Sequence, residues 1–334
     1  MKCLVTGAGG FIGGNITRRL LKLGHEVVTF QRGNYPELNQ LGGTHLQGSI
    51  TQKELLMDAM KEVDAVFHVA ALAAISGPRE DFEQANVLGT RNVIEACKAN
   101  GVQRLIFTSS PSVVFDGKDQ IGIDESESYP SHYLADYPRT KAIAEAEVIA
   151  ANSDQFWTIS LRPHLVWGPG DRHLFPRIIE RARQGKLKLV RRRGMKIDAC
   201  YIDNAVDAHI CALNQIATNP DCRGKSYFVS NGEPTSPEDL INSFLSCAEM
   251  NPIRPSVSPF LAKAAGWLIE NIYRTSFFSG EPPLTRFVAH QQSTSHWFDL
   301  SAAKRDLDWQ PTISTAVGIE RLRQHHSEEE PVST

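Results

Sequence analysis

Long apolar stretches are missing from this chain: no window approaches about 18 uninterrupted apolar residues, which excludes a membrane-spanning helix. The six cysteines are scattered, without a Cys-x-x-Cys pair or a spacing typical of a metal site. We therefore predict no metal, and because the chain begins directly with the strand-like KCLVTG we expect a reducing, cytoplasmic setting. Neither sign of charge dominates, since 35 lysines and arginines stand against 38 aspartates and glutamates, so no nucleic-acid partner is expected.

The first 165 residues alternate β-rich runs with helical patterns. Strand, helix and strand in regular order imply right-handed crossovers, and hence an α/β fold with a doubly wound parallel sheet in residues 1–165. Return elements from about 195–230 are expected to join this domain. Residues 166–325 should form mostly a smaller, irregular substrate-binding region, and 326–334 a disordered tail. The predicted strands read KCLVTG, HEVVTF, DAVFHVA, RLIFTS and WTISLRP, and the predicted helices span about 12–23, 52–60, 83–99, 137–151 and 174–184.

A glycine-rich turn, TGAGGFIG, follows the first predicted strand and opens the first predicted helix. Gly7 permits a tight turn, Gly10 lets backbone N–H groups approach a pyrophosphate, and Gly13 lets the helix pack closely on the strand. Because the motif has the strand before it and the helix after it, we predict a dinucleotide-binding loop.

The second predicted strand ends at Gln31 and Arg32, where many dinucleotide enzymes carry an acidic residue for the adenosine ribose. A carboxylate there repels a 2′-phosphate, whereas an amide and a cation accommodate it. The pair therefore predicts a preference for NADP(H) over NAD(H). The alternative is that Arg32 points into solvent.

Tyr137 and Lys141 stand one helical turn apart in DYPRTKAI, a spacing that chance alone can produce. Their context is informative, because the preceding strand ends at Ser109 and Ser110, on the edge of the sheet that faces the ligand. We predict that Tyr137 exchanges the proton of a ketone or hydroxyl, that Lys141 lowers the pKa of this tyrosine and holds the nicotinamide ribose, and that Ser110 binds the substrate oxygen. Ser109 is the alternative serine.

TGAGGFIG, FTSS, YPRTK and LRPHLVWGPGD resemble the extended short-chain dehydrogenase/reductase family over about the first 230 residues. The resemblance implies a Rossmann domain, a Ser110, Tyr137 and Lys141 active site, and a homodimer formed through the helices at 83–99 and 137–151. It also implies that Val69 lines the cofactor and that Asn86 orders the site. The expected cofactor contacts are Gly7, Gly10, Phe11, Ile12, Gly13, Arg32, Ser49 (where many relatives have an aspartate), Ile50, Ala70, Ala71, Tyr137, Lys141, Pro163 and Val166.

The substrate class is less directly encoded. Nucleotide-sugar members of the family carry an arginine that clamps a diphosphate, and this chain has Ile197 at that position. LRPHLVWGPGDRHLF and YIDNAVDAHI resemble the 3β-hydroxysteroid dehydrogenase branch. FQRGNYP, KAIAEAEVIAAN, SNGEP and EPPLTRF are more similar to bacterial reductases of olefin biosynthesis, which implies reduction of a 2-alkyl-3-oxoalkanoic acid by NADPH. Steroid or sterol-4α-carboxylate oxidation, nucleotide-sugar chemistry and a non-catalytic NADP sensor remain alternatives.

Two further features have competing interpretations. A helix over 260–273 places Phe260, Leu261, Ala264, Leu268 and Ile272 at helical spacing around Trp267. We interpret it as a core-facing or lid helix, with peripheral membrane contact as the alternative. His164 and His173 fall near the predicted crevice, and we interpret both as hydrogen-bonded packing residues because Tyr137 already serves as the acid–base.

Overall fold

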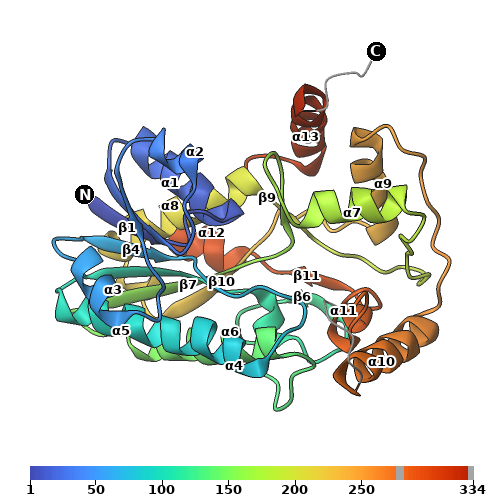
Figure 1. Cartoon of the computed structure of the whole chain (residues 1–334), viewed down its shortest axis with the longest axis horizontal. Helices are drawn as coiled ribbons and strands as arrows, with labels where there is room; N and C mark the ends of the chain where they lie inside the picture. Colours follow the sequence, from blue (N-terminus) through green and yellow to red (C-terminus); the bar gives the residue numbers. More distant parts are fainter. Residues whose placement is uncertain (276–281, 330–334) are drawn as a thin grey trace.

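The computed structural model describes residues 1–275 and 282–329 and is built on one seven-stranded parallel sheet (Figure 1). The strand order is β10-β7-β5-β4-β1-β2-β3. From β1 the chain adds β2 and β3 on one side and then β4, β5, β7 and β10 on the other, so the predicted doubly wound α/β fold is confirmed. β10 supplies the edge strand from within the predicted return elements. The strands are β1 (Lys2–Thr6), β2 (Glu26–Gln31), β3 (Thr44–Gln47), β4 (Ala65–His68), β5 (Arg104–Thr108), β7 (Trp157–Pro163) and β10 (Lys225–Val229).

Helices cover both faces of the sheet. One face carries α1 (Phe11–Lys22), α8 (Ile202–Thr218) and α12 (Ser301–Leu307), and the other carries α3 (Lys53–Ala59), α5 (Gly89–Ala99) and α6 (Asp136–Ala150). The strands are hydrophobic on both sides for this reason: Leu4 packs toward the α3–α5 layer while Val5 packs toward α1 and α8. Shorter elements in this half are α2 (Pro36–Asn39), α4 (Arg79–Phe82), a π-helical turn (Glu83–Leu88) and 3₁₀ turns at Pro111–Val114 and Pro220–Cys222.

Two short parallel strand pairs lie outside the seven-stranded sheet. β6 (Gln120–Ile123) pairs with β11 (His296–Phe298), and β8 (Val166–Trp167) pairs with β9 (Cys200–Tyr201). The tail differs from the prediction, because residues 326–329 form the end of a helix, while 330–334 lie outside the described residues. The helices of the smaller region are α7 (Leu174–Arg183), α9 (Pro237–Cys247), α10 (Pro259–Thr275), α11 (Arg286–Gln291) and α13 (Thr315–Glu329).

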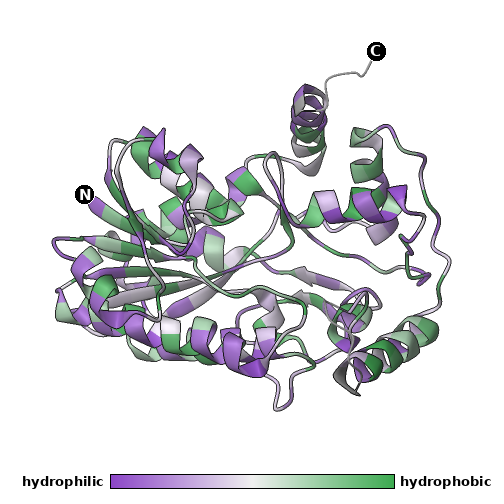
Figure 2. Ribbon diagram, in the orientation of Figure 1, coloured by the Kyte–Doolittle hydropathy of each residue, from purple (hydrophilic) through white to green (hydrophobic). Residues whose placement is uncertain are grey.

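Helix α10 has the predicted extent but not the predicted orientation. Phe260 is 78% exposed and Trp267 56%, and Leu261, Leu268 and Ile272 are exposed as well. The core-facing interpretation is therefore wrong for this apolar face, which Figure 2 shows in green along α10. The lid and membrane-contact interpretations stay predictions. Within the described residues, no helix is both long and apolar enough to cross a membrane.

The helices expected to form a dimer contribute part of their apolar faces to the interior. Val93 and Ala96 of α5 are completely buried against α3 and the sheet. On the outer surface, Leu88 and Ile143 line a groove where α5 and α6 run side by side, bridged by the Arg91–Glu147 ion pair. A homodimer through this outer surface stays a prediction.

Candidate active site

The carboxyl ends of the parallel strands bring the predicted site residues to one edge of the sheet. Gly7 follows β1, Gln31 ends β2, Ala70 follows β4, Ser110 follows β5, and Pro163 ends β7. Neighbouring strands in this set are in parallel register, so their ends lie side by side. Ligands of doubly wound sheets bind at this edge.

The glycine loop is packed too tightly for side chains. Gly7 has a φ of 73°, and a Cβ there would lie 2.8 Å from the backbone of Ala70. A Cβ on Gly13 would collide with the backbone oxygen of Gly7. The loop can therefore bring α1 against β1 only with glycine at these positions, which leaves the N-terminus of α1 directed at the groove.

A groove of about 810 Å³ runs along this edge. The buried Gln31 Oε1 has no hydrogen-bond partner among the described residues, and a ribose hydroxyl would supply one. The residues present thus fit an adenine dinucleotide. The expected cofactor contacts that line the groove are Gly7, Gly10, Phe11, Ile12, Gly13, Arg32, Ser49, Ile50, Ala70, Ala71 and Val166, together with Val69.

A smaller hollow of about 160 Å³ lies beside Ser110, Tyr137 and Pro163. The Ser110 side chain lies close enough to Tyr137 to lower the pKa of its phenol, and Ser110 Oγ forms a hydrogen bond of 2.9 Å with Ser112 Oγ. Ser109 does not line the hollow, and its side chain lies beside the buried carboxylate of Glu145 instead. The geometry therefore favours Ser110 over Ser109 as the serine that meets a substrate.

Lys141 is 2% exposed and lies one helical turn from Tyr137. Its ammonium donates to the backbone oxygen of Thr108 at 2.7 Å and lies 3.9 Å from the centre of the Phe107 ring. Burial lowers the pKa of Lys141 to about 7, and the negative charge of Glu145 opposes this shift. At this pKa the lysine can change charge near neutral pH.

The pKa of Tyr137 moves opposite to the expected direction. Burial raises it above the ordinary value, and the hydrogen bond with Ser110 opposes the rise. Lys141 does not overcome this rise in the pKa of Tyr137, because its ammonium is directed at the backbone oxygen of Thr108. A phenol that stays protonated is suited to donate a proton.

Behind Lys141 lies a buried ion pair that the sequence patterns did not reveal. Glu145 is fully buried, and its carboxylate accepts from Arg162 at 2.6 Å and from Ser160 at 2.7 Å. Tyr129 donates to the same carboxylate at 2.8 Å. Burial alone would raise the pKa of Glu145, but Arg162 holds it below the ordinary value. Its position four residues after Lys141 was the only available signal.

Asn86 connects three parts of the site. Its Oδ1 accepts from the backbone N–H of Leu72 at 2.7 Å, and its Nδ2 donates to Thr140 Oγ1 at 3.0 Å. It lies in the π-helical turn that precedes α5, and such turns occur often at functional sites. Asn86 therefore ties the segment after β4 to the helix that carries Tyr137 and Lys141.

The predicted packing histidines have different surroundings. His164 is 5% exposed, donates from Nδ1 to the backbone oxygen of Asp198, and lines the hollow beside Tyr137. His173 lines the cofactor groove but is exposed, so the packing interpretation is wrong for it; its backbone N–H donates to Asp171. The hydrogen-bonded role expected of His164 is seen, but it lies at the candidate site.

The remaining wall of the hollow comes from residues that sequence reasoning missed. Phe287 and Gln291 belong to α11, and His296 and Phe298 to β11, which reaches the site through its pairing with β6. These residues follow Tyr137 by 150 or more positions and carry no motif, so no local signal marks them. Phe115 and Gln120 complete this wall.

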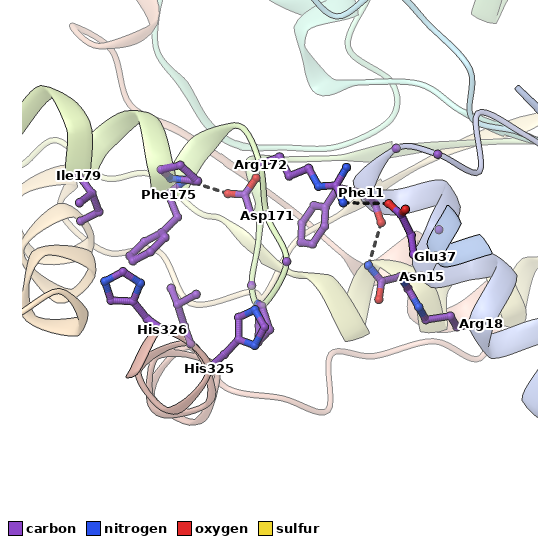
Figure 3. A pocket seen from close by; sticks show the side chains of 18 of the residues that line it. Phe11, Asn15, Arg18, Glu37, Asp171, Arg172, Phe175, Ile179, His325 and His326 are labelled. Carbon is purple, nitrogen blue, oxygen red and sulfur yellow. Dashed lines mark hydrogen bonds and ion pairs between the residues drawn. The ribbon is translucent and has the colours of Figure 1, made fainter. Parts of the chain in front are cut away.

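A separate cavity of about 780 Å³ lies on the other side of the glycine loop. Ser110, Tyr137 and Lys141 do not line it, so it is distinct from the candidate active site. Arg172 and Glu37 form an ion pair of 3.0 Å at its mouth. Figure 3 shows its walls: Phe11, Asn15 and Arg18 from α1, Phe175 and Ile179 from α7, and His325 and His326 from α13.

Comparison with known proteins gives matches along almost the whole chain. Residues 4–256 match the model of the 3-beta hydroxysteroid dehydrogenase/isomerase family. A 2-alkyl-3-oxoalkanoate reductase from Shewanella oneidensis is 45% identical over 96% of this chain and 84% of its own length. A protein of the same description from Stenotrophomonas maltophilia is 43% identical over 97% of this chain and 98% of its own. A human sterol-4-alpha-carboxylate 3-dehydrogenase is 31% identical over 97% of this chain and 87% of its own.

Solved structures share the fold at lower identity. A UDP-glucose 4-epimerase from Thermotoga maritima superposes with a TM-score of 0.76 at 20% identity, covering 98% of this chain and 99% of that one. A UDP-glucuronic acid 4-epimerase from Bacillus cereus, solved with NAD, gives a TM-score of 0.75 at 22% identity over 98% and 99%. At these identities the likeness concerns the fold alone.

Proposed function

Because the chain belongs to the 3-beta hydroxysteroid dehydrogenase/isomerase family, and is thus an NAD(P)-dependent dehydrogenase/reductase of the extended short-chain type, we propose that it reduces a 2-alkyl-3-oxoalkanoic acid to the 2-alkyl-3-hydroxyalkanoic acid. The resemblance seen in the sequence motifs is confirmed by the family match. Relatives at 45% and 43% identity bear the name of this reductase and support the choice of substrate.

The observation that carries the proposal is the hollow that holds Ser110 and Tyr137. Its lining combines aromatic and apolar side chains with serine, glutamine and histidine, and in the part of the chain that the structure describes it includes no lysine or arginine to clamp a diphosphate. Ile197, at the position where a nucleotide-sugar enzyme would carry its arginine, is buried in an apolar cluster. A ketone with apolar alkyl chains and no diphosphate fits these surroundings better than a nucleotide sugar does.

In the proposed reaction, Ser110 holds the ketone oxygen and Tyr137 gives it a proton. The raised pKa of Tyr137 keeps the phenol protonated before transfer. Lys141, one turn along α6, favours the phenolate left behind through its positive charge. A reduced nicotinamide dinucleotide, when bound in the groove, supplies the hydride.

Tyr137→Phe tests this role. Loss of the general acid should lower turnover by about 10²- to 10⁴-fold while NADPH binding, followed by fluorescence titration, stays nearly intact. Tyr133→Phe is the control, because the Tyr133 hydroxyl donates to the backbone oxygen of Val113 and the residue does not line the hollow. Near-normal turnover in Tyr137→Phe would refute the assigned role.

The substrate is tested by a spectrophotometric screen with NADPH and NADP. The 2-alkyl-3-oxoalkanoic acid and its 3-hydroxy acid should react faster than a 3β-hydroxysteroid or a UDP-sugar. Faster turnover of either alternative would assign the chain to that chemistry instead. Absence of NADPH oxidation on every ketone would favour a cofactor-sensing role.

We also propose that NADP(H) is preferred over NAD(H). Arg32 is exposed at the rim of the groove, and within the described residues its guanidinium has no ion-pair partner. It is therefore available for a 2′-phosphate, while Gln31 adds no negative charge to repel one. Arg32→Ser should raise KM for NADPH about tenfold and leave KM for NADH unchanged, since a charge-assisted hydrogen bond is worth roughly 1.5–3 kcal/mol. A tenfold preference of the unmodified enzyme for NADH would contradict this proposal.

A further inference from the structure

The hollow beside Tyr137 gives a charged substrate few partners. Its lining residues, all in the described part of the chain, include no lysine, arginine, aspartate or glutamate. The proposed substrate nevertheless carries a carboxylate, separated from the ketone carbon by a single carbon. A carboxylate buried without a donor is strongly unfavourable, and the strongest hydrogen bonds to it come from a lining group that can gain a positive charge. His164 and His296 are the two side chains of this kind.

Each of these rings is anchored at one nitrogen by a backbone carbonyl. His164 Nδ1 bonds the oxygen of Asp198, and His296 Nε2 bonds the oxygen of Gln291 at 3.1 Å. A carbonyl can only accept, so these two nitrogens carry the protons of the neutral rings. His164 Nε2 and His296 Nδ1 are then acceptors, and the latter is buried without a partner among the described residues.

The two rings, which we call the histidine pair, meet edge to face. Their centroids are 4.8 Å apart, and His164 and His296 are 5% and 6% exposed. The charged groups nearest the pair already have partners: Asp119 is paired with Arg192, and the carboxylate of Asp198 accepts from Ser230. The pair therefore has unused hydrogen-bonding capacity beside the reacting groups.

We propose that the histidine pair is the carboxylate subsite of this enzyme, and that one proton taken up from solvent turns a ring nitrogen of the pair into the donor that holds the substrate. The inference rests on the proposed function, and it assigns the preference for a substrate with a carboxylate to His164 and His296. An imidazolium donates at both nitrogens, so it keeps its backbone carbonyl while it binds the carboxylate. A neutral ring cannot do both.

Binding and protonation are coupled in this arrangement. Burial lowers the pKa of His164 and of His296, and a charge on His296 lowers that of His164 further, so the empty pair is neutral at pH 7. The negative charge of Asp119 acts in the opposite direction on His296. A bound carboxylate raises the pKa of the pair, and binding of the acid must weaken as the pH rises.

The test uses oxidation by NADP of a 2-alkyl-3-hydroxyalkanoic acid and of its methyl ester, because a 3-oxo acid loses carbon dioxide spontaneously. His164→Gln and His296→Gln should each raise KM for the acid about tenfold or more, and change KM for the ester less than about twofold, as expected for a lost charge-assisted hydrogen bond. As the pH increases, KM for the acid should rise by up to about tenfold per pH unit in the unmodified enzyme. This dependence of KM on pH should be weaker in the variants.

His290→Gln is the matched control. His290 lies on α11 and bonds the backbone oxygen of Gly117, but it does not line the hollow. Thermal melting and NADPH titration identify a variant that has lost its fold, and the pH profile of the unmodified enzyme tests the proposal without any substitution.

Three outcomes separate the two proposals. Equal losses on acid and ester, or a KM for the acid that does not change with pH, would overturn the histidine pair while leaving the reductase intact. If the unmodified enzyme oxidises neither the acid nor the ester, the proposed function fails. An acid-selective loss supports both.

Discussion

Glu145→Gln is the perturbation that most directly probes how the fold supports catalysis. The substitution keeps the shape of the side chain and removes a fully buried negative charge one turn from Lys141. The carboxylate accepts two hydrogen bonds of 3.1 Å and one of 2.6 Å from Arg162, one of 2.7 Å from Ser160 and one of 2.8 Å from Tyr129. A glutamine oxygen can satisfy only part of this set.

The expected cost to stability follows from the burial of the partner. The side chain of Arg162 is 3% exposed, so the variant leaves a guanidinium charge buried without its counter-ion. Breaking such a pair costs about 3–5 kcal/mol, and we expect the lower end, about 3 kcal/mol, because glutamine retains one acceptor. Urea unfolding followed by circular dichroism measures this free energy.

Glu147→Gln is the control on the same helix. Glu147 pairs with Arg91 at the surface, where side-chain exposures are 28% and 53%, and such pairs contribute about 0–1 kcal/mol. If Glu145→Gln costs no more than this control, the buried pair does not stabilise the fold as argued.

Glu145→Gln should also shift the pH dependence of turnover. Burial has already brought the pKa of Lys141 to about 7, and Glu145 opposes that shift, so its removal lowers the pKa further. Because the ammonium is the form that assists Tyr137, activity is lost as the pH rises through the pKa of Lys141. The alkaline limb of the rate profile should therefore move to lower pH in Glu145→Gln. An alkaline limb shared with Glu147→Gln would refute the coupling.

Two further predictions concern the glycine loop and helix α10. Gly13→Ala should weaken NADPH binding at least about tenfold in a fluorescence titration, because its Cβ would collide with the backbone oxygen of Gly7, whereas Gly77→Ala, whose Cβ meets only ordinary contacts, should bind normally. If α10 contacts membranes, the chain should float with vesicles of phosphatidylcholine and phosphatidylglycerol. Trp267→Ser should then reduce flotation more than Leu55→Ser, which changes an exposed apolar residue outside α10. Absence of flotation by the unmodified chain would contradict membrane contact.

The parts of the site that the sequence predicted are those whose signals are local. Gly7 and Gly13 are marked by a strand before them and a helix after them, and Tyr137 and Lys141 by one helical turn. Each of these patterns reflects a short-range requirement of the backbone, so it can be interpreted without the fold. The choice of Ser110 over Ser109 needed the structure, because both serines fit the same sequence motif and only the directions of their side chains differ.

The parts that escaped prediction depend on contacts between distant segments. Glu145 is an ordinary helical residue until Arg162 from β7 meets it in the interior. The exposed face of α10 has the periodicity of a core helix, and periodicity does not say which side of a helix its neighbours cover. Burial also reversed the expected direction for the pKa of Tyr137, since desolvation depends on everything packed around the phenol.

The origin of the two walls of the hollow shows how such a site can change substrate without changing chemistry. Ser110 and Tyr137 are fixed by β5 and α6, within the central sheet and its helices. Phe287 and His296 come from α11 and β11, and β11 is held to the site by its pairing with β6. Substitutions in this later segment can therefore reshape the substrate wall while Tyr137 and Lys141 stay in place. The epimerase of 20% identity shares the fold alone. Residues 286–298, which carry His296, and His164, which follows β7, are therefore the places where the proposed selectivity for an acid should be tested.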